Sequence, residues 1–450
     1  MNLPQGWKVV SVADVAAAMF DGPFGSALKT SDYTDHGVRV ARLENIGHLR
    51  FRDELESFVS QAKADSLRRH LLAGGDILFS SFVDRETRVC LVPKGLDGRM
   101  INKADCFCVR TVRVICDPRF LAYKLAAPSS CERFSNSVRG ITRPRIGLRD
   151  LAAFELDLPP LAEQHRIVAK LDTLFARLAR ARAELDRLPK LGRLLRRQAL
   201  AACFGNPDWD RTELGSLLHG IEAGKNMRCE ERPPTESEVG VVKVSAVTWG
   251  RFDAMESKTL PFDYSPPEKA RIRSGDLLIS RANTLELVGA VALVEEEPRG
   301  LYLSDKILRL VLDQDAKKWV LWFLRSPAGR HQIESLATGN QLSMRNISQD
   351  ALRRIRLPFP PREVRQEMIG RLEASFVRAD LLQAEAARAC ALLDRLEAAI
   401  LTKAFKGELV PQDPNDEPAS VLLERIRAQR AAAAPPSKAE RGRRLGSAAG

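Results

Sequence analysis

Two short stretches come close to catalytic motifs, and each lacks a group that its chemistry needs. Residues 220–226 approach the phosphate-binding loop G-x-x-x-x-G-K-[ST], whose final hydroxyl holds Mg²⁺. The stretch is one residue short and has Asn226 where that hydroxyl belongs. Glu256-Ser257-Lys258 has the Glu-x-Lys order of metal nucleases, but no acidic residue precedes it at a convincing distance. We interpret the first stretch as a basic loop and the second as a solvated turn.

The Pro-Pro pairs are a third candidate for chemistry. An adenine methyltransferase holds a flipped base with an (Asn/Asp)-Pro-Pro-(aromatic) loop, because the polar side chain bonds the exocyclic amine while the aromatic ring stacks on the base. The pairs here lie within residues 232–235 and 265–268, at Pro159-Pro160 and at Pro360-Pro361. None of them has this pattern. The sequence therefore predicts a protein that is not an enzyme.

The eight cysteines and six histidines are dispersed along the chain. Only Cys106 and Cys108 are close together, and no second pair completes a tetrahedral zinc site. We expect reduced, buried cysteines, no metal site and no cofactor.

Side chains suited to reading DNA bases gather at two places in each half of the chain. Base reading needs paired donors and acceptors at the end of a rigid element, with Arg suited to guanine and Asn or Gln to adenine. One group follows a Gly-Asp strand: Ser80, Ser81, Asp84, Arg85 and Arg88, and later Ser280, Arg281, Asn283 and Thr284. The other precedes a long helix: Arg139, Thr142, Arg143 and Arg145, and later Asn340, Gln341, Ser343, Arg345 and Asn346. The alternative for any one of them is ordinary surface polarity.

A further group lies on expected strands. Arg39 and Arg42 in the first half, with Lys243 and Ser245 in the second, stand at or near alternating strand positions. They line a DNA-facing sheet edge or, equally, cover the solvent face of the sheet.

Charge and composition agree with a nucleic-acid partner. The net charge is +12 and the pI about 9.5, and such a surplus of cations can replace the counterions condensed on phosphates. A chain of 450 residues, 44% hydrophobic and 28% charged, is expected to form two or three well-cored domains. It has no apolar run of spanning length and no signal-peptide order at its start, so we expect a cytoplasmic protein without a membrane.

The elements that must position these groups are duplicated. Leu158-Pro159-Pro160 and Phe359-Pro360-Pro361 each open a long helical stretch, 201 positions apart. Residues 37–42 pair with 240–245, residues 74–80 with 274–280, and Trp7 with Trp209. The chain is a tandem repeat of one unit with two parts.

The first part of each unit is expected to be α/β. Strand-like runs lie at 38–43, 76–81, 89–93 and 107–116, and in the second copy at 241–247, 276–280, 289–294 and 307–312. Helical segments are expected at 61–72 and 119–126, and at 317–325.

The second part is a long helix with an apolar seam. The first seam is Ile167, Leu171, Leu174, Leu178, Ala181, Leu185 and Leu188. The second is Met368, Leu372, Ser375, Ala379, Leu382, Ala386, Ala389, Leu393, Leu396 and Ile400. Spacings of three and four predict an antiparallel coiled coil of the two helices, the alternative being a helix packed on its own domain. Pro189 predicts a kink or short break in the first helix.

Two motifs resemble the specificity subunit of a type I restriction–modification system. Residues 158–168, LPPLAEQHRIV, are close to that family's hallmark at the end of a recognition domain, and residues 401–410 with 416–419 resemble its C-terminal ending. The second proline motif, Arg362 to Gln366, is a degraded copy. The resemblance covers residues 1 to 425.

The resemblance implies two target recognition domains that each read half of a split site in double-stranded DNA. It also implies helices that set the gap and dock two adenine methyltransferase subunits, to which motor-nuclease subunits are added. The expected segments are a first recognition domain (1–158), a first spacer helix (159–205), a second recognition domain (206–358), a second spacer helix (359–410) and a C-terminal extension (411–450) whose basic tail begins at 431. The rivals are a coiled-coil scaffold that binds no DNA and the recognition part of a related methylation-based defence system.

Overall fold

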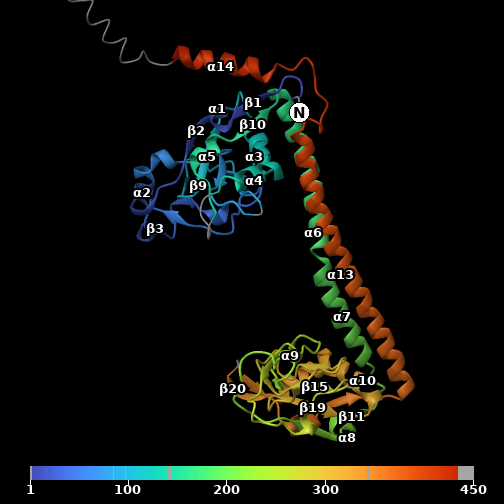
Figure 1. The fold of residues 1–450 in the computed structure, drawn as a ribbon. Coiled ribbons are helices and arrows are strands. Elements are labelled where there is room, and N and C mark those ends of the chain that lie inside the picture. The colour runs from blue at the N-terminus through green and yellow to red at the C-terminus, as the bar shows by residue number, and fades with distance from the viewer. Residues whose placement is uncertain (1–2, 85, 97, 139–143, 342–343, 434–450) are drawn as a thin grey trace, which may run out of the picture. The chain divides into compact units, whose positions relative to one another are not determined.

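Two compact units make up the chain, and each is described on its own. The computed structural model describes residues 3–84, 86–96, 98–138, 144–341 and 344–433 (Figure 1). The first unit joins residues 1–183 with 389–450, and the second comprises residues 184–388. The helix that spans residues 362–404 therefore contributes to both units.

The first unit is built on an antiparallel four-stranded sheet. Its strands run in the order β2 (Ala16–Phe20), β9 (Cys106–Thr111), β6 (Ile77–Ser80), β7 (Val89–Leu91). A second sheet has the order β3 (Tyr33–Thr34), β5 (Phe58–Val59), β4 (Val38–Ala41), β8 (Met100–Asn102), and β1 (Lys8–Ser11) pairs with β10 (Glu155–Leu158). The helices are α1 (Val12–Val15), α2 (Gln61–Ser66), α3 (Pro118–Ala126), α4 (Pro128–Ser135) and α5 (Leu148–Ala152).

The second unit repeats this plan. Its main sheet has the order β12 (Gly220–Ala223), β19 (Ile307–Val311), β15 (Leu277–Ser280), β17 (Val291–Leu293). The smaller sheets are β14 (Ser257–Thr259), β13 (Gly240–Val242), β18 (Leu301–Tyr302), then β16 (Ala282–Asn283), β21 (Met344–Asn346), β20 (Thr338–Gln341), and the pair β11 (Arg211–Glu213) with β22 (Arg356–Pro358). The helices are α8 (Leu214–Leu217), α9 (Ser245–Thr248), α10 (Gln314–Arg325), α11 (Pro327–Leu336) and α12 (Gln349–Arg353).

The shared strand order confirms the duplication and the α/β class of both domains. One predicted strand was wrong in part: the run 241–247 ends as a strand at Val242, and its second half is the short helix α9. Two of the four residues from Ser245 to Thr248 are β-branched, so propensity alone favours a strand; the helical turn instead places Ala246 and Val247 in the core of the domain.

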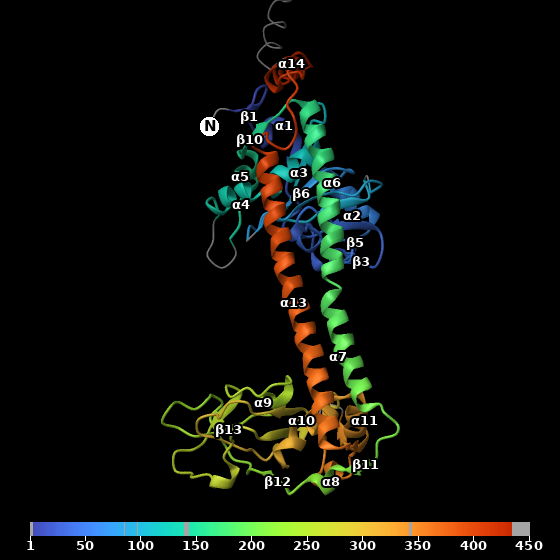
Figure 2. The same cartoon turned by 90° about the vertical axis from the view of Figure 1, so that its right-hand side faces the viewer.

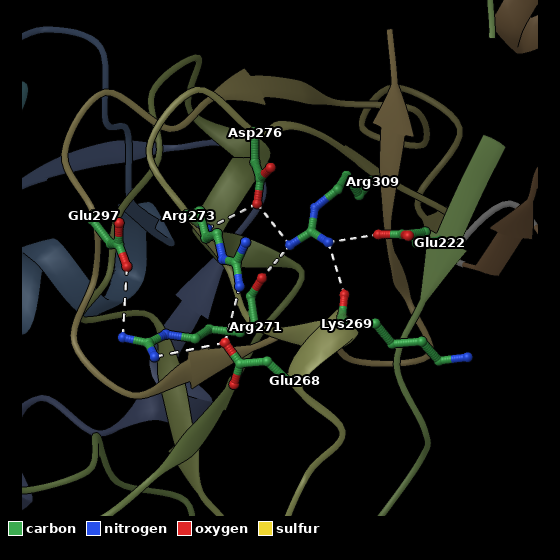
Figure 3. Close-up of polar contacts among 8 residues, drawn as sticks. All are labelled: Glu222, Glu268, Lys269, Arg271, Arg273, Asp276, Glu297 and Arg309. Atoms are coloured by element: carbon green, nitrogen blue, oxygen red, sulfur yellow. Dashed lines mark hydrogen bonds and ion pairs between the residues drawn. The ribbon is translucent and has the colours of Figure 1, made fainter. Parts of the chain in front are cut away.

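The repeated Gly-Asp pair is a structural feature of each main sheet. Asp76, which is nearly fully buried, accepts from the neighbouring strand's Arg110, with Nη2 and Oδ2 at 2.7 Å. Asp276 forms the same pair with Arg309, again at 2.7 Å, and Glu222 lies on the other side of that guanidinium at 2.6 Å (Figure 3). A buried carboxylate is stable only when it is paired and hydrogen-bonded, so the repeat preserves the aspartate together with its arginine.

The first spacer is two helices, α6 (Leu161–Leu185) and α7 (Leu188–Phe204), and the second is one, α13 (Arg362–Ala404) (Figure 2). The break predicted from Pro189 is present at residues 186–187. Proline has no N–H to bond the carbonyl of Leu185, four residues earlier, and its ring clashes with that carbonyl. Pro189 instead occupies the first turn of α7, where no such bond is needed.

The helices pack antiparallel within each unit. In the first unit Arg182 of α6 forms an ion pair with Asp394 of α13, and in the second unit Arg196 of α7 pairs with Asp380. Gly192 allows the close approach of α7, because a Cβ atom there would lie 2.7 Å from the Gln383 side chain.

The buried face of α13 differs from the predicted seam in two places. Leu382 and Leu396 are exposed at 55% and 48%, and in the first spacer Ala181 is exposed as well. The more covered positions keep the heptad spacing but include polar residues: Leu372, Phe376, Ala379, Gln383, Ala386, Cys390, Leu393, Glu397 and Ile400. The partly covered residues Gln383 and Glu397 are polar, so the apolar pattern predicted the neighbouring Leu382 and Leu396 in their place.

The start of each long helix is tied to the α/β domain that precedes it by one side chain. The buried Gln164 side chain donates to the Pro159 and Ile115 carbonyls at 2.9 and 3.0 Å, and it accepts from the Asp117 amide at 2.9 Å. Arg365 stands 201 positions later, and it donates to the Pro360 carbonyl at 2.8 Å.

The second motif is therefore altered in sequence but keeps the same contact. Arg365 replaces the amide by a guanidinium, and an ion pair with Asp315 compensates its buried charge. The neighbouring contact is present in one copy: Trp7 Nε1 donates to the Glu163 carboxylate at 3.0 Å, whereas the corresponding position in the second motif is Val364. Burial raises the pKa of Glu163.

The C-terminal extension contains a helix that the sequence did not predict, α14 (Ala419–Ala433). Leu422, Leu423 and Ile426 are buried in the core of the first unit, and Arg427 pairs with Asp14 at 2.9 Å. The expected basic tail lies almost entirely outside the described residues.

Within the described part of the chain, no helix combines the length and the apolar character that a membrane crossing requires.

We predict that Gln164→Ala destabilises the first unit by about 2–4 kcal/mol, because it leaves two buried carbonyls and one partly buried amide without their partner. Chemical denaturation of the full chain, followed by circular dichroism, measures the loss. The control is Gln61→Ala, which removes an exposed amide with one 3.3 Å hydrogen bond. Equal stability of the two variants would contradict the role of Gln164.

Candidate DNA interface

The same backbone framework follows the Gly-Asp strand in both domains. After β6, the Ser81 amide donates to the Asp105 carbonyl at 2.9 Å, and the Ser81 carbonyl accepts from the Ile146 amide at 2.9 Å. After β15, the Arg281 amide donates to the Lys306 carbonyl at 2.7 Å, and the Arg281 carbonyl accepts from the Ile347 amide at 2.9 Å. In each domain, the strand end is thus held between a turn and the segment before a short helix.

A hollow of about 630 Å³ opens beside this framework in the second domain. Its polar lining includes four predicted residues, Ser245, Arg281, Asn283 and Asn346. The Asn283 Oδ1 atom accepts from the Thr284 amide at 2.8 Å, which fixes the direction of that side chain. The other lining residues are Val244, Thr248, Trp249, Ala282, Leu287, Asp305, Lys306 and Met344.

The first domain has a hollow of about 440 Å³ beside the equivalent framework. Arg145 lines it, and its Nη1 atom lies 3.7 Å from the Asp105 carboxylate. The Ser81 hydroxyl donates to the same carboxylate at 3.0 Å. The remaining lining residues are Asp21, Phe24, Phe107, Ile146, Gly147 and Leu148.

Asp21 lines this hollow and has a carboxyl group whose pKa is raised. Burial raises its pKa to about 6, although the Gly22 amide, which donates to its Oδ1 atom at 2.7 Å, works against the rise. The negative charge of Asp105 adds to it. The hollow therefore combines a guanidinium with two carboxylates, groups that bond the edges of a base pair.

Several predicted residues have internal partners instead. Arg39 is 7% exposed and forms an ion pair with Asp53. Ser80 and Ser280 are fully buried, and their hydroxyls bond the Phe82 and Leu287 carbonyls at 3.2 and 3.3 Å. These three side chains are engaged by partners within their own domain.

Ser245, which lines the hollow of the second domain, also donates to the Glu256 carboxylate. Arg42 lies outside both hollows and pairs with Glu44 at 2.9 Å. Arg88, Lys243 and Arg345 are half-buried. Asn340 and Gln341 lie on β20, while Arg85, Arg139, Thr142, Arg143 and Ser343 lie outside the described residues.

Sequence reasoning missed part of each hollow: Asp21, Asp105, Asp305, Lys306, Trp249 and Met344. A positional signal was present for two of them, because Asp105 and Lys306 stand 201 positions apart, each directly before an equivalent strand of the repeat. Trp249 is 76% exposed and has no counterpart in the repeat that would have selected it. Among the described residues no three His, Cys, Asp or Glu side chains gather as a metal site requires.

The fold and the hollows define a class of protein with two copies of one α/β recognition domain, each tied to an antiparallel helix pair. Comparisons with known proteins agree. The family described as "Type I restriction modification DNA specificity domain" matches residues 4–188. In this match and in those that follow, the chain is similar to the specificity subunits of type I restriction–modification systems.

Curated relatives cover both domains. The chain is 29% identical to the EcoKI specificity subunit of Escherichia coli K12, over 62% of this chain and 66% of that protein, just under two thirds. It is 23% identical to the StySPI specificity subunit of Salmonella potsdam, over 96% of each.

Solved structures share the fold. The HsdS subunit of Thermoanaerobacter tengcongensis superposes with a TM-score of 0.58 at 22% identity, covering 91% of this chain and 99% of that chain. A chain from a study of type I R-M complex assembly reaches 0.69, also at 22% identity, covering 91% and 100%.

We predict that Asp21→Asn stabilises the protein at pH 7.5 by about 1 kcal/mol, after discounting for the exposed part of the group. A carboxyl with a raised pKa penalises the folded state above about pH 6, and the penalty disappears as the group is protonated toward pH 4. Thermal unfolding at both pH values measures the difference, with the exposed Asp35→Asn as control. A stabilisation that is as large at pH 4 would contradict this cause.

Proposed function

We propose that this chain is the DNA-reading subunit of a type I restriction–modification complex. Each recognition domain reads one half of a bipartite target in double-stranded DNA. The helices carry the adenine methyltransferase subunits, two in the complete assembly, and motor-nuclease subunits join through them. The chain itself supplies recognition and no catalytic group, and it works in the cytoplasm.

The observation that carries this proposal is the pair of hollows on equivalent frameworks. Each has side chains that present donors and acceptors, and the two sets differ in chemistry. A duplicated scaffold with different polar ends is suited to reading two different short sequences. The +12 net charge supports binding to the phosphates on either side.

Exposed leucines on the helices support the docking of another subunit. In the second unit Leu191, Leu194 and Leu195 of α7 are 43% to 54% exposed, and Leu381 and Leu382 of α13 are 59% and 55% exposed. Leu195 and Leu381 adjoin the Arg196–Asp380 ion pair, so they lie at the same level of the helix pair. Apolar side chains gathered on a surface mark a protein-binding site.

We expect that exchanging residues 206–358 for the matching domain of a relative with another target alters one half of the methylated site only. Each domain has its own core and its own hollow, so its reading does not depend on the other. Methylation sequencing of cells that carry the chimera and a methyltransferase subunit measures this. The control is the purified chain alone with S-adenosylmethionine and DNA, which should give no product. A change in both half-sites, or product from the chain alone, would contradict the proposal.

A double change, Leu195→Glu with Leu382→Glu, should weaken methyltransferase binding at least tenfold. A leucine buried in an interface contributes about 1.5–3 kcal/mol, and a carboxylate there adds a desolvation cost. Titration calorimetry with the isolated methyltransferase subunit measures the affinity. Leu55→Glu changes a side chain of similar exposure, 59%, in a recognition domain and should bind normally. Unchanged affinity of the double variant would place the docking surface elsewhere.

A further inference from the structure

Arg145 and Asn346 occupy the same place in the two recognition domains. Arg145 forms an antiparallel bridge with Phe82, two residues beyond β6, and Asn346 pairs in the same sense with Ala282, two residues beyond β15. The residue that follows each one is a buried isoleucine, Ile146 or Ile347, whose amide bonds the carbonyl of the strand end at 2.9 Å. One backbone position thus presents a different side chain to each hollow.

Asp105 orients the Arg145 side chain but leaves its guanidinium free to donate hydrogen bonds to another molecule. Its side chain is 59% exposed, and one guanidinium nitrogen lies 3.7 Å from the Asp105 carboxylate. An exposed pair at this distance contributes little energy, so it orients the guanidinium without competing strongly with DNA. A guanidinium donates two parallel hydrogen bonds, which match the O6 and N7 acceptors of guanine in the major groove.

Asn346 offers the complementary chemistry in the second domain. It is exposed at the hollow, and within the described part of the chain its side-chain amide makes no hydrogen bond. An amide presents one acceptor and one donor, which match the N6 amine and N7 of adenine. Trp249 and Met344 line the same hollow at 76% and 60% exposure, and such apolar groups suit the methyl group of the paired thymine.

We propose that the first domain reads a guanine through Arg145 and that the second reads an adenine at the equivalent position through Asn346. This inference rests on the proposed function, because it names the bases that the two hollows select. The other use of Arg145, a contact to a phosphate, would support affinity without selecting a base.

Methylation motifs of cells that carry the chain with its methyltransferase decide between these uses. In Arg145→Ala, one guanine of the first domain's half-site should become degenerate, with a discrimination loss of about tenfold or more, and the other half-site should stay intact. In Asn346→Ala, one adenine of the second domain's half-site should relax in the same way. Arg145→Asn should shift the preference at its position from guanine toward adenine.

The control is Arg299→Ala, which removes a 90% exposed cation from the second domain and should leave the motif unchanged. Thermal unfolding should be the same in all variants, because the side chains at 145 and 346 are exposed. If the wild-type chain directs no bipartite methylation, the proposed function fails. If it does, but the alanine variants relax no base or weaken methylation evenly at every site, this inference is overturned.

Discussion

The architecture depends on the hydrogen bonds that tie each recognition domain to the start of its helix. A reading domain is useful only if its side chains keep a fixed orientation relative to the helices that carry it. Gln164 provides this by bonding three backbone groups from two segments, two of them in buried hydrogen bonds and the third in a partly buried one. Arg365 reaches the same proline carbonyl and recruits Asp315 to balance its charge. The junction therefore persists although the sequence at its centre has changed from a neutral amide to a cation.

The repeat, the helix break at Pro189 and most strands of the main sheets could be predicted from the sequence, because each follows from a sequence repeat or from local chain chemistry. The repeat was visible because the Gly-Asp and Pro-Pro pairs recur at nearly constant spacing, 200 and 201 positions apart. The break before α7 followed from Pro189, since a missing N–H and a ring clash act locally. Three of the four strands in each main sheet were predicted, at 77–80, 89–91 and 106–111 and at 277–280, 291–293 and 307–311, because each is a short run of largely buried β-branched or apolar residues. The edge strands β2 and β12 are less buried and were not predicted, and β12 lies in the stretch that was interpreted as a basic loop.

Features that depend on tertiary contacts could not be predicted. Leu382 and Gln383 are adjacent, and only the partner helix decides which one is covered; Gly192 fits Gln383, so the leucine faces outward. Helix α14 contains many alanines and arginines and shows its apolar side only where Leu422 and Leu423 meet the first unit's core. The hollows bring Asp21 beside Arg145 from sequence positions over a hundred residues apart, which no local pattern reveals.

The contrast between exposed and covered positions explains how the recognised bases can change while the fold stays constant. At the equivalent positions 145 and 346, the backbone is held by strand bridges and by the buried isoleucine that follows, so the side chain before that isoleucine contributes little to folding. Exchange of an exposed side chain usually changes stability by less than about 0.5 kcal/mol, whereas a mismatched base contact costs about 1–3 kcal/mol in discrimination. Because the first quantity is smaller than the second, this position can acquire a new base preference without destabilising the domain. By contrast, Asp76 and Asp276 lie at the other end of the same strands, each largely covered and paired with an arginine of the neighbouring strand, so an uncharged replacement would remove the 2.7 Å ion pair with Arg110 or Arg309.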